Sequence, residues 1–186
     1  MTRSLVAVVA LVGLAFAPAL AQAPKSPDVK PAPAGRRAIV TMDKGGEIVL
    51  EFFAEDAPRH VENFLTLAGK GFYDGQRVHR VEPKFVVQFG DPQSKTLPMN
   101  DSRMGSGGPG YTIKAEFNGR KFDRGILGMA RTSDPDSAGS QVYIMLAPAY
   151  SLNGQYTAFG HVTKGMEVVD QIKVGDRIKS VKVVTP

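Results

Sequence analysis

The segment 78–92 places a single arginine and a single glutamine among apolar residues. If this segment forms two strands joined by a turn, Arg80 and Gln88 can meet on one exposed surface, because alternate strand residues share a face. Phe85 or Val86 would then lie beside them. An arginine with apolar neighbours can donate hydrogen bonds to a bound group in a partly dry setting, and it can equally form an ordinary solvent-exposed ion pair. These residues alone leave both interpretations open.

Other catalytic chemistries lack the residues that they need. The chain has no cysteine, which excludes a disulfide framework, a zinc ribbon and a thiol nucleophile. Its three histidines, His60, His79 and His161, include no close pair at metal-ligand spacing, so we expect neither a metal site nor another cofactor. The sequence contains no G-x-S-x-G motif, which would indicate a serine hydrolase. The glycine-rich run 105–110 lacks the Lys-Ser/Thr ending of a phosphate-binding loop.

The composition predicts one globular domain. Of the 186 residues, 42% are hydrophobic and 22% are charged, and the formal net charge is +5. The basic residues are scattered along the chain rather than gathered in a stripe, so we expect no nucleic-acid partner. Nothing in the sequence requires a second subunit, and we expect a monomer.

The first residues are typical of an export signal. Arg3 precedes an apolar run over 5–17, and residues 19–21 (Ala-Leu-Ala) supply the small-x-small pattern of a cleavage site. We predict a signal peptide over 1–21, whose removal leaves a net charge of +4 from 22 basic and 18 acidic side chains. The apolar run is too short to span a bilayer, so we expect no stable membrane association; an uncleaved anchor is the alternative. The sequence therefore predicts a periplasmic or secreted protein.

A proline-rich segment over 22–35 separates this signal from the domain. It contains four prolines and offers almost nothing to bury, which is typical of an extended spacer or of a ragged terminus. We place the domain at 36–186.

Within the domain, short apolar or alternating runs bounded by Gly, Pro and Asn predict strands. The runs 38–42 and 48–53 flank an Asp-Lys-Gly-Gly turn, which is a hairpin signal. We expect one helix with Asp56 as its N-cap and Pro58 in its first turn, and a second over Met166 to Ile172. Many short strands with two isolated helices indicate an antiparallel barrel or sandwich, and closure would remove the exposed edges. The other predicted strands are 77–81, 85–89, 126–130, 141–146, 158–162 and 178–184.

Four blocks follow one another in a recognisable order. The first, 78–92, matches the signature F-H-R-V-I-x-x-F-M-x-Q-G-G-D-P with four variants, Val78, Glu82, Val86 and Phe89. The others are GGPGYTIKAEF at 107–117, RGILGMA at 124–130 leading to SAGSQ at 137–141, and LNGQYTAFG at 152–160. Together they resemble the cyclophilin-type peptidyl-prolyl cis-trans isomerases in an exported bacterial form, over about residues 37–184.

This resemblance implies a mainly β fold, a closed eight-stranded antiparallel β-barrel capped by two α-helices, with the substrate groove on the outside of the barrel. It implies an enzyme that accelerates rotation about X-Pro bonds of proline-containing polypeptides, and so assists the folding of exported proteins. No covalent bond breaks in that reaction, so it needs no nucleophile or metal. The alternative is a non-catalytic chaperone or proline-binding module that uses the same groove.

The resemblance also assigns roles to individual residues. Arg80 takes the position of the catalytic arginine, and Gln88 and Gln141 match polar positions that orient it and the substrate backbone. Residues 130–132 match the segment that pairs with the substrate chain. His79 precedes Arg80 as in the family and either lines the groove edge or has a structural role. The full set of implied substrate-binding residues is His79, Phe85, Val86, Gln88, Met129, Ala130, Arg131, Gln141, Tyr143, Leu152 and Tyr156.

Several positions depart from the family pattern. Ser151 stands where forms that bind cyclosporin tightly often have tryptophan, and losing the indole removes contact area and an N–H donor, so we expect weak cyclosporin binding. The loop 93–106 is longer than in many members; it either shapes substrate choice or is an inert insertion, and we favour the inert interpretation. The other replacements, for the common methionine, asparagine, phenylalanine and histidine, are Val86, Arg131, Tyr143 and Tyr156.

Overall fold

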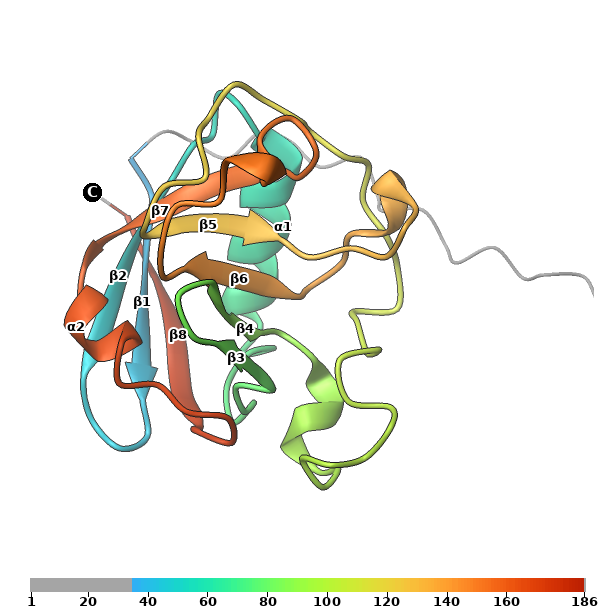
Figure 1. Ribbon diagram of the computed structural model, residues 1–186. Coiled ribbons are helices and arrows are strands. Elements are labelled where there is room, and N and C mark those ends of the chain that lie inside the picture. Colours follow the sequence, from blue (N-terminus) through green and yellow to red (C-terminus); the bar gives the residue numbers. More distant parts are fainter. Residues whose placement is uncertain (1–34, 186) are drawn as a thin grey trace, which may run out of the picture.

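A computed structural model describes residues 35–185 of the chain. The predicted signal peptide and nearly all of the predicted linker lie outside these residues. The described part forms one eight-stranded antiparallel sheet with the strand order β3-β4-β6-β5-β7-β2-β1-β8, and it carries two α-helices (Figure 1). The strands are β1 Arg37–Met42, β2 Glu47–Phe52, β3 Arg80–Glu82, β4 Val86–Phe89, β5 Ile126–Met129, β6 Val142–Met145, β7 Ala158–Lys164 and β8 Ile178–Val184; the helices are α1 Pro58–Gly69 and α2 Met166–Val169.

The sheet is an open half-barrel, so the prediction of a closed barrel is wrong. β3 and β8 stand at the two ends of the strand order, and no ladder joins them within residues 35–185. The chain meets β8 just before β3 begins, through the isolated bridge between Arg77 and Arg177 and a 2.8 Å hydrogen bond from the Val78 N–H to the Asp176 carbonyl. β3 itself is only three residues long. Three further backbone hydrogen bonds of 2.8 Å join residues 75–78 to residues 175–178. The two edges are therefore linked next to this bridge and not along a full strand pair.

The predicted hairpin is confirmed, and the predicted strands are present, except that the strand expected over 77–81 is reduced to β3, Arg80–Glu82. β1 pairs with β2 in a register that sets Ala38 opposite Leu50 and Val40 opposite Ile48, and all four side chains are buried. The connecting turn holds Gly45 at a φ of 93°, a backbone conformation that L side chains rarely adopt. The alternation of apolar residues therefore identified both the strands and the face that each one buries.

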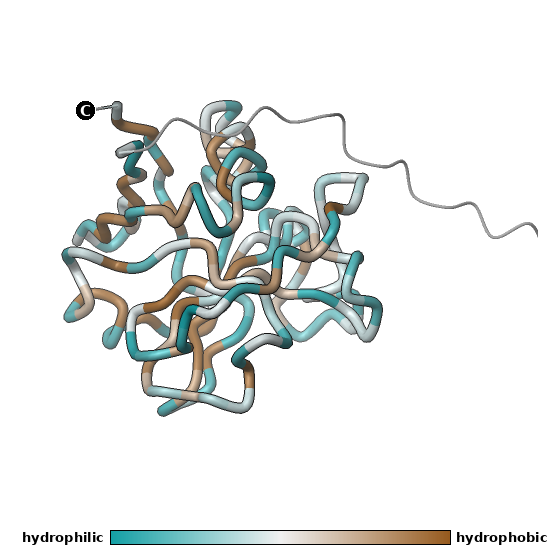
Figure 2. Tube along the Cα trace, turned by 90° about the horizontal axis from the view of Figure 1, so that it is seen from above, coloured by the Kyte–Doolittle hydropathy of each residue, from teal (hydrophilic) through white to brown (hydrophobic). Residues whose placement is uncertain are grey.

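The sheet carries an apolar cluster on each of its faces. The main core lies on the inner face and includes the buried side of α1, from Val61, Phe64 and Leu65. A smaller cluster lies on the outer face of β4, β5, β6 and β7. Figure 2 shows hydrophobic stretches along the strands and hydrophilic stretches at many outer turns. The buried members of the outer cluster are Val86, Phe122, Tyr143, Met145 and Ala158.

The start of α1 differs from the prediction, because Asp56 is not its cap. The Asp56 carboxylate instead pairs with Arg120 at 2.7 Å. The helix N-terminus is capped from a distant loop, where Glu116 accepts hydrogen bonds from the backbone N–H groups of Arg59 (3.1 Å) and His60 (3.0 Å). Pro58 does begin the helix, as expected.

The second helix is shorter than predicted. α2 ends at Val169 instead of Ile172, because the chain turns at Asp170 toward Gly175, whose φ is 92°. Among residues 35–185, no helix has the length and apolar character that crossing a bilayer requires.

Candidate active site

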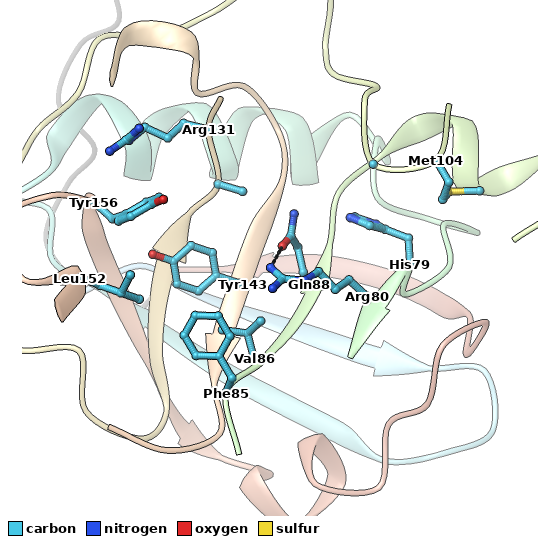
Figure 3. A pocket seen from close by; sticks show the side chains of 12 residues that line it. His79, Arg80, Phe85, Val86, Gln88, Met104, Arg131, Tyr143, Leu152 and Tyr156 are labelled. Carbon is cyan, nitrogen blue, oxygen red and sulfur yellow. Dashed lines mark hydrogen bonds between the residues drawn. The ribbon is translucent and has the colours of Figure 1, made fainter. Parts of the chain in front are cut away.

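A hollow of about 510 Å³ lies on the outer face of the sheet, over β3, β4 and β6 (Figure 3). Ten of the twelve predicted site residues line it. Gln141 lines an adjoining hollow of about 560 Å³, and Met129 lines neither. Two lining residues, Met104 and Gly105, were not predicted. The ten are His79, Arg80, Phe85, Val86, Gln88, Ala130, Arg131, Tyr143, Leu152 and Tyr156.

Arg80 is held by a chain of side-chain amides. The β3–β4 register sets it opposite Gln88, whose Oε1 accepts a hydrogen bond from the guanidinium at 3.2 Å (Figure 3). The Gln88 Nε2 donates to Oε1 of Gln141 at 3.0 Å, and the Gln141 Nε2 donates to the carbonyls of Gly105 and Gly107 at 2.8 Å each. The two carbonyls can only accept, so they fix which end of the Gln141 amide carries the nitrogen. The orientation of Gln141 in turn fixes that of the Gln88 amide. The arginine is thereby oriented by groups that reach back to the backbone.

The rest of the Arg80 side chain remains available. It is 44% exposed, its Nε lies 3.5 Å from the exposed Glu82 carboxylate, and its guanidinium carbon lies 5.7 Å from the centre of the Phe85 ring. A guanidinium carries five N–H donors, and Gln88 uses only one of them. The remaining donors can serve a ligand beside the Phe85 ring.

The wall formed by Met104 and Gly105 depends on the buried carboxylate of Asp91. Asp91 is fully buried; one oxygen accepts from the Gln93 N–H at 2.8 Å and the other from the Gly105 N–H at 2.6 Å and the Gly107 N–H at 3.3 Å. A Cβ at Gly107 would lie 2.2 Å from this carboxylate, so only glycine fits there. Asp91 therefore fixes both ends of the loop 93–106, and the end of this loop, Met104 and Gly105, lines the hollow.

The floor of the hollow combines apolar side chains with a phenol. Phe85, Val86 and Leu152 surround the Tyr143 ring, which is 5% exposed and packs edge-on against Tyr156 with ring centres 6.2 Å apart. Burial raises the pKa of the Tyr143 hydroxyl far above its usual value of 10.0, so the phenol is neutral at physiological pH.

The Tyr143 ring fits only because its neighbour on β5 is a glycine. Gly128 stands opposite Tyr143 in the ladder, and a Cβ there would lie 2.2 Å from the Tyr143 Cζ. A side chain at position 128 would displace the ring that forms the floor.

Met129 does not lie where the resemblance suggested. Its side chain is 1% exposed and belongs to the main core on the inner face, together with Leu127. The reason is strand parity: residues 127 and 129 point inward, and residue 128 faces Tyr143 on the outer face. Met129 therefore supports the site from behind the sheet and does not line the hollow.

His79 lies at the groove edge, packed behind the loop end. Its ring carbon Cδ2 is the nearest atom, at 3.7 Å, to the position of a Cβ at Gly105. Burial lowers the pKa of the His79 ring, against the opposing effect of the Asp91 carboxylate. The ring is thus neutral at pH 7 and is suited to packing.

This arrangement brings a fixed hydrogen-bond donor to an apolar hollow. Within residues 35–185, no three His, Asp or Glu side chains gather as a metal site would require. Among the unpredicted lining residues, Met104 carried no periodicity that marks it, because it lies in an irregular loop. The site therefore offers a guanidinium donor beside an apolar hollow that can hold a small apolar ring.

The comparisons with known proteins agree with this geometry. Residues 38–185 match the family model described as cyclophilin type peptidyl-prolyl cis-trans isomerase/CLD. The chain is 42% identical over 144 residues to peptidyl-prolyl cis-trans isomerase B of Bacillus subtilis, covering 76% of this chain and 94% of that protein. It is 40% identical over 146 residues to a probable peptidyl-prolyl cis-trans isomerase of Brucella abortus, covering 77% of this chain and 74% of that protein. The chain belongs to the cyclophilin-type peptidyl-prolyl cis-trans isomerase family, and it is an enzyme of that class.

Solved structures show the same fold. A cyclophilin-type isomerase of Cryptosporidium parvum, crystallised in the presence of the dipeptide Ala-Pro, superposes with a TM-score of 0.69 at 26% identity, covering 81% of this chain and 99% of that one. A cyclophilin from Hirschia baltica superposes with a TM-score of 0.67 at 20% identity, covering 78% of this chain and 73% of that one.

Proposed function

We propose that the hollow on the outer face binds X-Pro segments of exported polypeptides, and that Arg80 catalyses their isomerisation and so assists their folding. The supporting observation is the guanidinium that Gln88 and Gln141 hold beside the apolar floor. The Cryptosporidium relative that was crystallised with Ala-Pro supports a proline-containing ligand.

The reaction is a rotation, and its barrier comes from amide resonance. Turning about the C–N bond costs about 18–20 kcal/mol because conjugation gives that bond double-bond character. Both isomers of an X-Pro bond are accessible, but they exchange over tens to hundreds of seconds without a catalyst. A catalyst must therefore bind the twisted amide more tightly than either planar form.

The geometry suits that task. As the amide twists, its nitrogen becomes pyramidal and gains a lone pair, and a free N–H of Arg80 can donate to it or to a neighbouring polar atom. Phe85, Val86 and Leu152 would hold the proline ring and exclude water, which strengthens the donated hydrogen bond. No step needs a proton transfer.

The activity is tested with the full chain, by measuring the exchange of a proline peptide by NMR. Arg80→Ala is expected to lower kcat/KM on the order of 100-fold, as loss of one aligned donor typically does. Arg124→Ala is the matched control, because Arg124 pairs with Asp170 on the surface and lines neither hollow. Exchange at the Arg80→Ala level in the unaltered protein would reject catalysis and leave the chaperone or proline-binding alternative.

Export is part of the proposal and rests on the sequence of residues 1–21. Expressed in a bacterial host with two membranes, the protein is expected in the periplasmic extract with Gln22 as its first residue. Ala21→Leu should block cleavage and retain the longer chain. Recovery of uncleaved, unaltered protein from the membrane would favour the anchor instead.

Weak cyclosporin binding is also proposed. Ser151 is exposed beside Leu152 and offers no flat wall or indole donor to a ligand in the hollow. Ser151→Trp should tighten inhibition by cyclosporin relative to the unaltered protein. Equal inhibition of both proteins would remove Ser151 as the cause.

A further inference from the structure

Arg131 forms a fixed positive group at the end of the hollow opposite Arg80 (Figure 3). Its guanidinium carbon lies over the Tyr156 ring, 4.4 Å from the ring centre. One terminal nitrogen donates to the carbonyl of Thr132 at 2.8 Å, and the other donates to the carbonyl of Gln155 at 2.9 Å. A guanidinium held in this way loses little conformational freedom when a ligand binds.

The charge of Arg131 is not neutralised by a neighbouring acid. Within residues 35–185, no carboxylate oxygen lies within 4.0 Å of its nitrogens. Asp134 and Asp136 belong to the same loop, but both carboxylates accept hydrogen bonds from the backbone. The Asp134 carboxylate accepts from the Asp136 N–H at 2.9 Å, and the Asp136 carboxylate accepts from the Ala115 N–H at 2.9 Å. Arg80 differs, because Glu82 lies beside it.

Arg131 also stands where the two hollows meet. Four residues line both hollows: Gln88, Gly105, Ala130 and Arg131. A polypeptide whose proline occupies the first hollow passes Arg131 when it continues into the second. Neither hollow is lined by an aspartate or a glutamate. The buried Asp91 carboxylate lies behind the wall of the second hollow, where the N–H groups of Gly105 and Gly107 donate to it.

We infer that Arg131 selects substrates that carry an aspartate or glutamate within two residues of the proline, on the one side that runs into the second hollow. The inference rests on the isomerase activity proposed above and names the substrate class of the same site. The contact is a guanidinium–carboxylate pair at a partly exposed position, so it acts mainly on KM and weakens as salt rises.

The test uses proline peptides that differ only by Glu or Gln at each of the two positions before and the two after the proline. For the full chain at low salt, kcat/KM is expected to be about two- to fivefold higher for Glu than for Gln on one side of the proline only. Arg131→Gln should abolish this ratio, whatever its effect on the rate with the Gln peptides, and Arg131→Lys should retain part of the ratio. Arg124→Gln is the control and should retain the full ratio.

The outcomes separate this inference from the proposed function. Equal rates for Glu and Gln peptides at every position would overturn the role of Arg131 and leave the isomerase intact. A preference that persists in Arg131→Gln, or that appears equally on both sides of the proline, would assign it to Arg80 or to the overall charge and overturn the inference. Failure to accelerate any peptide would reject the proposed function itself, and the inference with it. If Arg131→Gln does not fold, the unaltered protein still decides, because a Glu/Gln ratio unmoved by added salt contradicts a charge contact.

Discussion

The two faces of β4, β5 and β6 differ in what covers them. On the inner face, Val87, Leu127 and Ile144 are buried in the main core, which also contains the buried side of α1. On the outer face, Val86 and Tyr143 lie at the floor of an open hollow. Successive residues of one strand thus have different roles. Those that point inward stabilise the fold, and those that point outward form the floor of the hollow. Substitutions on the two faces should separate stability from activity.

The largest expected effect is on the inner face. Ile144→Ala removes buried methylenes and should lower the free energy of unfolding by about 2–5 kcal/mol. Leu152→Ala on the outer face should cost about 1 kcal/mol or less, because this side chain is only half-buried, and it should raise KM. Urea unfolding and peptide exchange measure the two effects. Equal loss of stability in both variants would contradict the division between the faces.

The next largest effect is expected at Gly128. Gly128→Ala must displace the Tyr143 ring, which should cost about 1–3 kcal/mol of stability and deform the floor of the hollow. Gly119→Ala is the control, because no atom lies within 4 Å of its Cβ position. We expect kcat/KM to fall only in Gly128→Ala. Full activity in that variant would show that the ring position is not critical.

Two buried tyrosines provide a smaller and sharper contrast. On the inner face, the Tyr73 hydroxyl donates to the Ser140 carbonyl at 3.2 Å, and Tyr73→Phe should cost about 1 kcal/mol. The Tyr143 hydroxyl makes no hydrogen bond to any other described residue, so Tyr143→Phe should leave stability unchanged or raise it. Thermal unfolding of both variants tests this. A loss at Tyr143 as large as that at Tyr73 would reveal a partner for the outer hydroxyl.

The smallest expected effect depends on pH and concerns the cap of α1. Burial acts to raise the pKa of Glu116, but hydrogen bonds from His60 and Arg59 outweigh it and hold the pKa below its usual value of 4.5. The carboxylate therefore contributes stability that is fully present above pH 4.5 and is lost as the pH falls through the lower folded-state value.

Glu116→Gln should accordingly cost about 1 kcal/mol at pH 7, and the difference from the unaltered protein should shrink below pH 4.5. Asp56→Asn is the control, since an exposed ion pair contributes about 0.5 kcal/mol or less. A difference at Glu116 that does not change with pH would show that the charge of the cap is unimportant.

Most of the fold followed from local patterns. The strands and the start of α1 at Pro58 were predictable, because the alternation of apolar residues and the positions of turn residues indicate secondary structure from only a few neighbouring residues. The placement of ten groove residues came from the family resemblance, since nothing in the period of a strand assigns a role to Arg80 or Tyr156.

What the sequence did not predict depends on contacts between distant segments. Glu116 displaces Asp56 as the cap because it reaches α1 from a loop more than 50 residues away. The sheet stays open because β3 is short, which its apolar run did not indicate. Met129 is an exception, because the alternation of a strand alone sets it on the same face as Leu127 and on the opposite face from Gly128.

The Asp91 carboxylate gives the neighbouring loop freedom to vary. One buried side chain binds the N–H groups of Gln93 at the start of the loop and of Gly105 at its end. We therefore expect that residues between Gln93 and Met104 can be inserted or deleted while Gly105 keeps its place in the groove wall. Loop closure becomes only slowly more costly with length. Related chains can thus diversify the surface beside the substrate while the catalytic arginine keeps its orientation, and the same span is a suitable place to graft a foreign peptide.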